Sequence, residues 1–133
     1  TGSDDKTARL WSAKTGQLLQ TFTETSRVWG VAFSPDSRRA LLALADGTGR
    51  ILDLTTGVEV RRLLGHTNSL LSGVFSPDGK LVLTTSADMT ARVWQVDYRD
   101  SLQALCARLT RDFSDAERAK YEIADKTPTC PGP

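Results

Sequence analysis

Several residue types that form common functional sites are scarce in this sequence. Its 133 residues include one histidine and two cysteines. A structural zinc site takes four such ligands, so these three side chains cannot form one by themselves. The sequence also lacks an apolar run of the ~20 residues that a membrane-spanning helix requires. We therefore expect no metal site and no contact with a membrane.

An excess of charge of one sign is missing as well. Lysine and arginine number 17 against 16 aspartates and glutamates, which gives a net charge of +1. Such a balance lacks the basic surplus of nucleic-acid-binding domains, so we expect no nucleic acid partner. The first residues contain no basic segment followed by an apolar one, as a signal peptide would, and we expect a cytoplasmic location. Because Thr1 is not an initiator methionine, we interpret the chain as the C-terminal piece of a longer protein.

Patterns typical of catalysis are also absent. No serine or cysteine lies in a recognisable nucleophile elbow. Gly47-Thr48-Gly49 lacks the lysine and the following helix of a phosphate-binding loop. His66 and Asp88 are candidates for an acid–base pair, but such pairs are also common in structural hydrogen-bond networks. We predict that the protein is not an enzyme and binds no cofactor.

The sequence does contain an internal repeat. Phe33-Ser34-Pro35-Asp36 recurs as Phe75-Ser76-Pro77-Asp78, 42 residues further on. Ser3–Trp11 matches Ser86–Trp94 after 83 residues, close to two periods, and Gly65-His66 opens the last unit. A period of about 40–45 residues with Gly-His and Trp landmarks is typical of propeller blades, each a four-stranded sheet. A β-sandwich with regular turns is the alternative, but it would hardly repeat two such turns and three Thr-x-Arg strands in one register.

This repeat resembles the WD-repeat family of β-propellers. The resemblance implies an all-β fold over residues 1–97, an incomplete β-propeller of about two and a half four-stranded blades. We predict a partial blade (1–22), a full blade (23–64) and a blade that lacks its outer strand (65–97). Propellers of this family often borrow that strand from the other end of the chain, so the resemblance implies that upstream blades of the same protein are partners. The predicted strands are 7–11, 17–22, 28–33, 39–44, 49–54, 58–64, 70–75, 80–85 and 90–96.

In this family a histidine, a serine or threonine, an aspartate and a tryptophan form a hydrogen-bonded set inside a blade. By position, the resemblance assigns this set to His66, Thr84, Asp88 and Trp94. A buried aspartate needs donors, and a neutral imidazole can donate to it while it accepts from a hydroxyl. The indole N–H of Trp94 needs an acceptor as well. We therefore expect a structural hydrogen-bond tetrad in the third blade.

The other two units keep less of this set. The first unit retains a partial tetrad, namely Thr1, Asp5 and Trp11. In the second unit the corresponding residues cannot form the network, and we predict that apolar packing replaces it; they are Glu24, Leu42, Asp46 and Leu52. Equivalent arginines occur in all three units, and we expect their stems to pack while their heads stay in water. These are Arg9, Arg50 and Arg92.

Trp29 is the candidate for partner binding. It aligns with Leu71 near the start of an inner strand, where side chains of related propellers often face the partner-binding end. An exposed aromatic residue there would be a plausible anchor, and burial between blades is the alternative. Because propellers present loops on a rigid scaffold, we predict a protein–protein interaction scaffold within a larger protein, with a protein partner. The alternatives are a regulatory or sensor module attached to an upstream kinase or nucleotide-hydrolysing signalling domain, and a purely structural segment.

The composition changes after Asp97, and we predict a small α-helical tail over residues 98–133. Leu102, Leu105, Cys106 and Leu109 share one helical face. The stretch 104–131 resembles tails that follow the last blade in some bacterial WD-repeat proteins. We expect Cys106 and Cys130 to lie close together, with Cα atoms within roughly 7 Å, as a disulfide or a close thiol pair. Free thiols are the expected state in the reducing cytosol.

Overall fold

The computed structural model describes residues 1–97 and Ser114. In this part of the chain nine β-strands form and no helix is present, so the expected all-β class is confirmed for residues 1–97. The predicted helical tail, together with Cys106 and Cys130, lies outside the described residues. Their proximity therefore stays a prediction.

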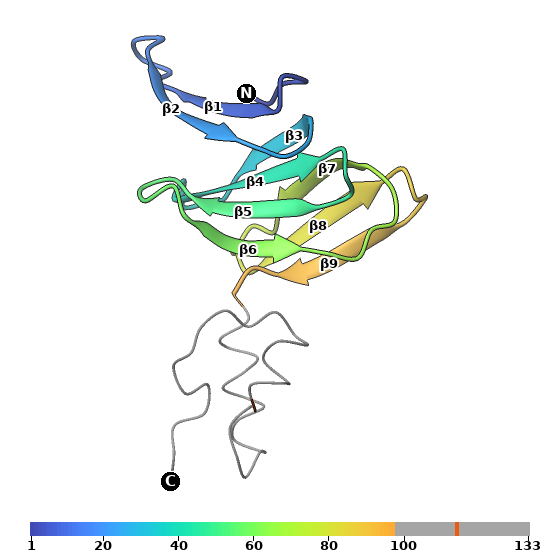
Figure 1. Ribbon diagram of the computed structural model, residues 1–133. Coiled ribbons are helices and arrows are strands. Elements are labelled where there is room, and N and C mark those ends of the chain that lie inside the picture. Colours follow the sequence, from blue (N-terminus) through green and yellow to red (C-terminus); the bar gives the residue numbers. More distant parts are fainter. Residues whose placement is uncertain (98–113, 115–133) are drawn as a thin grey trace, which may run out of the picture. The chain divides into compact units, whose positions relative to one another are not determined.

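The nine strands are arranged in three antiparallel sheets (Figure 1). The first blade contains β1 and β2, and residues 1–3 run beside β1 through a bridge between Gly2 and Ala8. The second blade has four strands in the order β3-β4-β5-β6, and the third has β7-β8-β9. The bounds are β1 Thr7–Trp11, β2 Leu18–Thr23, β3 Val28–Phe33, β4 Arg39–Leu44, β5 Gly49–Asp53, β6 Glu59–Leu63, β7 Leu70–Phe75, β8 Leu81–Ser86 and β9 Ala91–Gln95.

The repeated Ser-Pro-Asp turns close the first hairpin of the second and third blades in the same way. Ser34 Oγ donates to Asp36 Oδ1 at 2.6 Å, and Ser76 Oγ donates to Asp78 Oδ1 at 2.5 Å. The residue after each aspartate has a positive φ, 70° for Gly79 and 59° for Ser37. Proline at the first corner fixes φ for these turns. The sequence repeat is thus a repeat of local hydrogen bonding.

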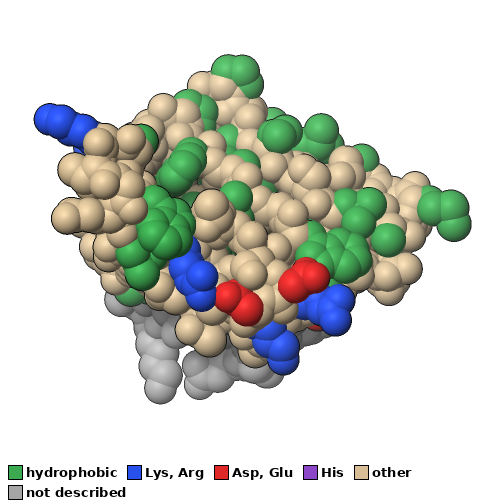
Figure 2. Space-filling model, turned by 90° about the horizontal axis from the view of Figure 1, so that it is seen from above, with side chains coloured by type: hydrophobic (Ala, Val, Ile, Leu, Met, Phe, Trp, Pro, Cys, Tyr) green, Lys and Arg blue, Asp and Glu red, His purple; other side chains and the backbone are tan. Residues whose placement is uncertain are grey.

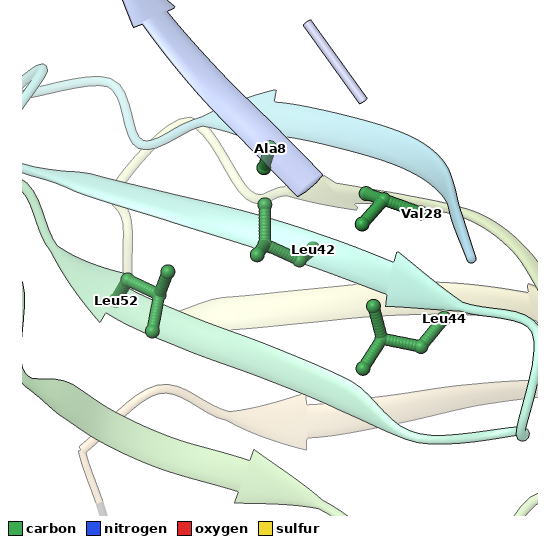
Figure 3. Close-up of a cluster of buried hydrophobic side chains, with 5 residues drawn as sticks. All are labelled: Ala8, Val28, Leu42, Leu44 and Leu52. Carbon is green, nitrogen blue, oxygen red and sulfur yellow. The ribbon is translucent and has the colours of Figure 1, made fainter. Parts of the chain in front are cut away.

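Two apolar clusters hold the blades together, one on each face of the second blade. On one face, side chains of β3, β4 and β5 pack against Ala8 of β1, as Figure 3 shows. On the other face, Leu41, Ile51 and Leu63 pack against Val82 and Val96 of the third blade. The residues of the first cluster are Ala8, Val28, Leu42, Leu44 and Leu52. A sheet covered on both sides needs apolar residues at successive positions, which explains the run Ala40–Leu44 in β4.

Apolar side chains of the second and third blades stay exposed at two places in the described residues. Val74, Leu83 and Val93 pair across the third blade, and their side chains are exposed. On the second blade, Phe33 of β3 is 61% exposed, whereas its counterpart Phe75 packs into the cluster shared with the second blade. Figure 2 shows the molecule from above, with hydrophobic side chains spread over this side and most of the visible charged ones along one edge. The residues at the equivalent positions of the neighbouring blade pack into the cluster between the second and third blades.

Candidate functional site

The loops that join β2 to β3, β4 to β5, β6 to β7 and β8 to β9 lie at one end of the sheets, on the right in Figure 1. We call this the loop end, and it consists of residues 24–27, 45–48, 64–69 and 87–90 together with the turn at 4–6. The alternating direction of antiparallel strands places these loops side by side. Both His66 and Trp29 lie in or next to this end.

The structure brings the four tetrad residues of the third blade together. His66 Nδ1 lies 2.7 Å from Asp88 Oδ2, and His66 Nε2 lies 2.9 Å from Thr84 Oγ1. The indole N–H of Trp94 donates to the same Thr84 Oγ1 at 2.7 Å. The imidazole side chain is 1% exposed. With Nδ1 donating to the carboxylate, Nε2 accepts from the threonine hydroxyl, so the neutral ring satisfies both neighbours. The set ties the β6–β7 loop to β8 and β9.

The carboxylate of Asp88 is saturated with donors. The Thr90 hydroxyl donates to Oδ1 at 2.6 Å, and the Thr90 N–H does so at 2.9 Å. His66 and the N–H of Thr67 bind Oδ2. The Thr90 hydroxyl bond, followed by that of His66, holds the pKa of Asp88 well below its usual value. A carboxylate occupied in this way serves as a structural acceptor, and the geometry gives no support to an acid–base role for the pair.

The partial tetrad of the first blade keeps one of these contacts. The indole N–H of Trp11 donates to Thr1 Oγ1 at 3.1 Å, the counterpart of the bond between Trp94 and Thr84. Asp5 Oδ1 accepts from the Thr7 hydroxyl at 2.6 Å, which lowers the pKa of Asp5. Asp5 Oδ2 pairs with Arg9 at 2.9 Å. The turn of this unit is therefore closed by an exposed ion pair.

The second blade departs from the prediction. Leu42 and Leu52 join an apolar cluster, as expected, but Glu24 is buried and its carboxylate pairs with Nη1 of Arg50. Arg50 Nε also pairs with Glu59, whose carboxylate receives Nε and Nη2 of Arg62, both at 3.1 Å. The expectation that the Arg50 head stays in water was therefore wrong. A buried carboxylate requires a partner, and the strand next to the loop supplies it.

The pKa values of this network reflect the same contacts. Burial opposes the charge of Arg50, but the bonds to Glu24 and Glu59 outweigh it, so the guanidinium pKa is raised. Burial also disfavours the charged form of Glu59, and the bonds from Arg62 and Arg50 nevertheless lower its pKa. The sequence offers two opposite charges, Glu24 at the position of His66 and Arg50 at that of Arg92, but position in the repeat does not place them in contact. Asp46, the remaining tetrad position, binds only the N–H and hydroxyl of Thr48 in the described contacts.

Trp29 lies exposed at a bulge near the start of β3. The register shifts between Val28 and Gly30, which leaves Trp29 unpaired with β4, and its side chain is 45% exposed. Leu71 occupies the same bulge position in β7 and is also 45% exposed. A complete four-stranded blade precedes Leu71, so exposure at this position does not require a missing neighbour. The alternative that Trp29 is buried between blades does not hold in this structure.

The bulges at Trp29 and Leu71 lie on adjacent inner strands. A methyl group added at Gly30 would come within 3.1 Å of the carbonyl oxygen of Leu71, so the two backbones approach closely there. Near them, Arg27 is exposed and makes no ion pair within residues 1–97. The sequence indicated Trp29 alone as a binding residue. Leu71 could be added only from the structure, in which β3 and β7 are neighbours and present the two side chains on one surface.

A pocket of about 150 Å³ lies between the first and second blades. Its lining is largely apolar, with Leu10, Phe22, Val31, Phe33 and Leu42 among its residues. Within the described residues no group of His, Cys, Asp and Glu side chains is arranged to hold a metal ion. The same part of the chain contains no helix long and apolar enough to cross a membrane.

A four-stranded blade packed against a three-stranded one that carries a His-Thr-Asp-Trp set is typical of propellers of the WD-repeat class. In agreement with this, the profile of the family described as "WD40: WD domain, G-beta repeat" matches residues 16–53 and 57–95. The chain belongs to this family. In the matched region the repeats cover most of the second and third blades.

Curated relatives share the repeats at moderate identity. Over 116 residues, 86% of this chain, it is 29% identical to anaphase-promoting complex subunit cdc20 of Dictyostelium discoideum. It is 37% identical over 100 residues, 72% of the chain, to WD repeat-containing protein 1 of Gallus gallus. Identity is 38% over 90 residues, 66% of the chain, with apoptotic protease-activating factor 1 of Danio rerio.

These relatives are much longer than the matched segment. The chain spans 23% of the cdc20 subunit, 16% of WD repeat-containing protein 1 and 7% of apoptotic protease-activating factor 1. WD-repeat proteins of this kind are generally non-enzymatic scaffolds that act through protein partners. The comparisons thus place the repeats within a class that works by binding proteins.

Proposed function

We propose that this chain is part of a propeller that acts as a protein–protein interaction scaffold in a larger protein. The observation that carries the proposal is the exposure of Trp29 and Leu71, two large apolar side chains at equivalent bulges of neighbouring strands. Tryptophan and arginine are enriched among the interface residues that contribute most of the binding energy. Arg27 lies two residues before Trp29 and is also exposed. The partner contacts the loop end around these residues.

Rigidity at the loop end supports the same proposal. The N–H of Ala45 donates to the Arg27 carbonyl at 2.9 Å, and the N–H of Ala87 donates to Ser69 at 2.9 Å. Ser69 Oγ joins the second and third blades through a 2.7 Å bond to the Ala45 carbonyl. A surface already held in one conformation loses little conformational entropy when a partner binds. The regulatory or sensor module attached to a signalling domain and the cytoplasmic location stay predictions, because they concern the whole protein.

The test compares full-length proteins that carry Trp29→Ala or Val58→Ala. Val58 is 62% exposed at the opposite end of the sheets and is the matched control. Partners captured with the wild-type protein are purified, and their affinity for each variant is measured directly. Loss of an interface anchor costs about 2 kcal/mol or more, so Trp29→Ala should raise Kd about 30-fold. Equal affinity of the two variants for every partner would place the binding surface elsewhere.

A further inference from the structure

We propose that Arg50 is a positioning residue, which holds the β2–β3 loop and thereby the segment from Arg27 to Trp29 in place. It acts through the ion-pair network of Glu24, Arg50, Glu59 and Arg62. The effect on loop structure stands by itself, and only its effect on partner binding rests on the proposed function. In the third blade, the tetrad residue His66 ties down the corresponding loop.

The network begins at the first residue after β2. Glu24 occupies the position of His66, and its side chain is 1% exposed. His66 reaches the neighbouring loop through Asp88, whereas Glu24 reaches strand β5 through Arg50. Arg50 is bound on its other side by Glu59 of β6. The loop is therefore attached to two strands of its own blade.

The β2–β3 loop depends on this attachment more than its counterpart does. Within residues 1–97, backbone bonds hold residues 24–27 at Glu24, whose N–H donates to Lys6, and at Arg27, whose carbonyl accepts from Ala45, and Glu24 makes the only side-chain bond that ties them to the rest of the chain. In the third blade, the loop is secured by His66, by the N–H of Thr67 on Asp88, and by Ser69 Oγ on Ala45. Ser86 Oγ adds a further bond to the Asn68 carbonyl. Removal of one side chain should therefore loosen the β2–β3 loop selectively.

An arginine is needed at position 50 because its donors point in two directions. Nε meets Glu59 and Nη1 meets Glu24, an arrangement that the planar guanidinium fork provides and a lysine ammonium does not. Breaking a buried ion pair on one side leaves the other charge without compensation. A substitution of Arg50 by lysine keeps the charge and removes the fork, so it tests the geometry itself.

The test measures amide hydrogen exchange of the full-length protein by mass spectrometry. Peptides that cover residues 23–29 report on the β2–β3 loop, and peptides that cover 64–71 report on the β6–β7 loop. Arg50→Lys should speed exchange in the first set at least about tenfold and change the second set much less, because Arg50 binds Glu24 of the first loop and no residue of 64–71 in the described contacts. Arg92→Lys is the matched control, since Arg92 makes no ion pair in the described part of the chain and lies against Gly65 of the other loop, and it should leave the first set unchanged.

A second variant guards against misfolding. Glu24→Gln retains the shape of the side chain and removes its charge, and it should loosen residues 23–29 in the same way. Unchanged exchange at 23–29 in both folded variants would overturn the proposal, and so would equal loosening of both loops. Faster exchange at 23–29 with undiminished partner affinity would support the positioning role of Arg50 and count against Trp29 as the binding anchor.

Discussion

The substitution His66→Ala gives a direct measure of the third-blade tetrad. It removes a side chain that is 1% exposed and bonds Asp88 at 2.7 Å and Thr84 at 2.9 Å. A hydrogen bond to a charged group contributes about 1.5–3 kcal/mol, and one between neutral groups about 0.5–1.5 kcal/mol. The expected loss of unfolding free energy is therefore about 2–4 kcal/mol. Asp88 keeps its bonds from Thr67 and Thr90, and this limits the loss.

The assay is urea unfolding of the full-length protein. A change in stability alone lowers the midpoint and leaves the slope m unaltered. Thr67→Ala is the control, because the side chain of Thr67 is exposed and only its backbone N–H binds Asp88; such a surface change should stay within about 0.5 kcal/mol. A His66→Ala midpoint no different from that of the control would refute a structural role for the tetrad.

A double variant tests whether Thr84 couples His66 and Trp94. Trp94→Phe removes the indole N–H that donates to Thr84 Oγ1, the atom that His66 also contacts. Residues that share a hydrogen-bond partner show non-additive effects of about 0.5–3 kcal/mol in such cycles. We therefore expect the cost of His66→Ala with Trp94→Phe to differ from the sum of the single costs. Strict additivity would mean that Thr84 does not couple the two side chains.

Two further outcomes follow from the turns. Hydrogen bonds from neighbouring hydroxyl groups are the main cause that lowers the carboxyl pKa values of Asp36, Asp78 and Asp88. A carboxyl group whose pKa is lower in the folded state than in the unfolded state stabilises the fold when the pH is above its unfolded pKa of about 4. This stabilisation is lost as the pH falls. The urea midpoint should thus drop between about pH 4.5 and 2.5, and Asp88→Asn should make the drop smaller; an equal drop in the variant would contradict this assignment. Gly47→Ala should lower the thermal midpoint more than Gly16→Ala, because both have positive φ (87° and 71°) but only the new methyl at Gly47 would meet a backbone atom, the Asn68 carbonyl oxygen at 2.8 Å. Left-handed strain alone costs about 1–2 kcal/mol, so equal midpoints would mean that the close contact relaxes freely.

Most of the strand order was predictable because the repeat fixes it. Ser-Pro-Asp turns and Thr-x-Arg strands recur at one spacing, and the observed strands begin and end within two residues of the predicted bounds. The tetrad contacts in the third blade could be inferred in the same way, since His66 and Asp88 occupy defined positions of the repeat. Position within the repeat is thus enough to predict the side-chain contacts of a blade that has the residues typical of the family.

The contacts of the divergent blade could not be inferred from position. Glu24 and Arg50 are 26 residues apart. The residues at the equivalent positions of the third blade are His66 and Arg92, and His66 pairs with Asp88 instead. Their contact depends on how closely the β2–β3 loop approaches β5, and tertiary packing sets this distance. The exposure of Trp29 depends on a bulge, and although a glycine inside a strand, such as Gly30, often marks one, it does not indicate which side chain is left exposed. Both features became visible only with the packing of neighbouring strands.

The second blade is packed on both faces, against Ala8 on one side and Val82 on the other. In a linear array, the stability of each unit is approximately the sum of its own internal energy and its nearest-neighbour interfaces. A unit with two such interfaces can be stable with fewer internal hydrogen bonds, and the second blade has a glutamate and two leucines where the third has histidine, threonine and tryptophan. Neighbouring blades with the same strand order are consequently held together by different interactions, an ion-pair network in one and a hydrogen-bonded tetrad in the other. A change in conditions that weakens ion pairs, such as a higher salt concentration, should therefore act on the loop held by Glu24 and Arg50 more than on the loop held by His66.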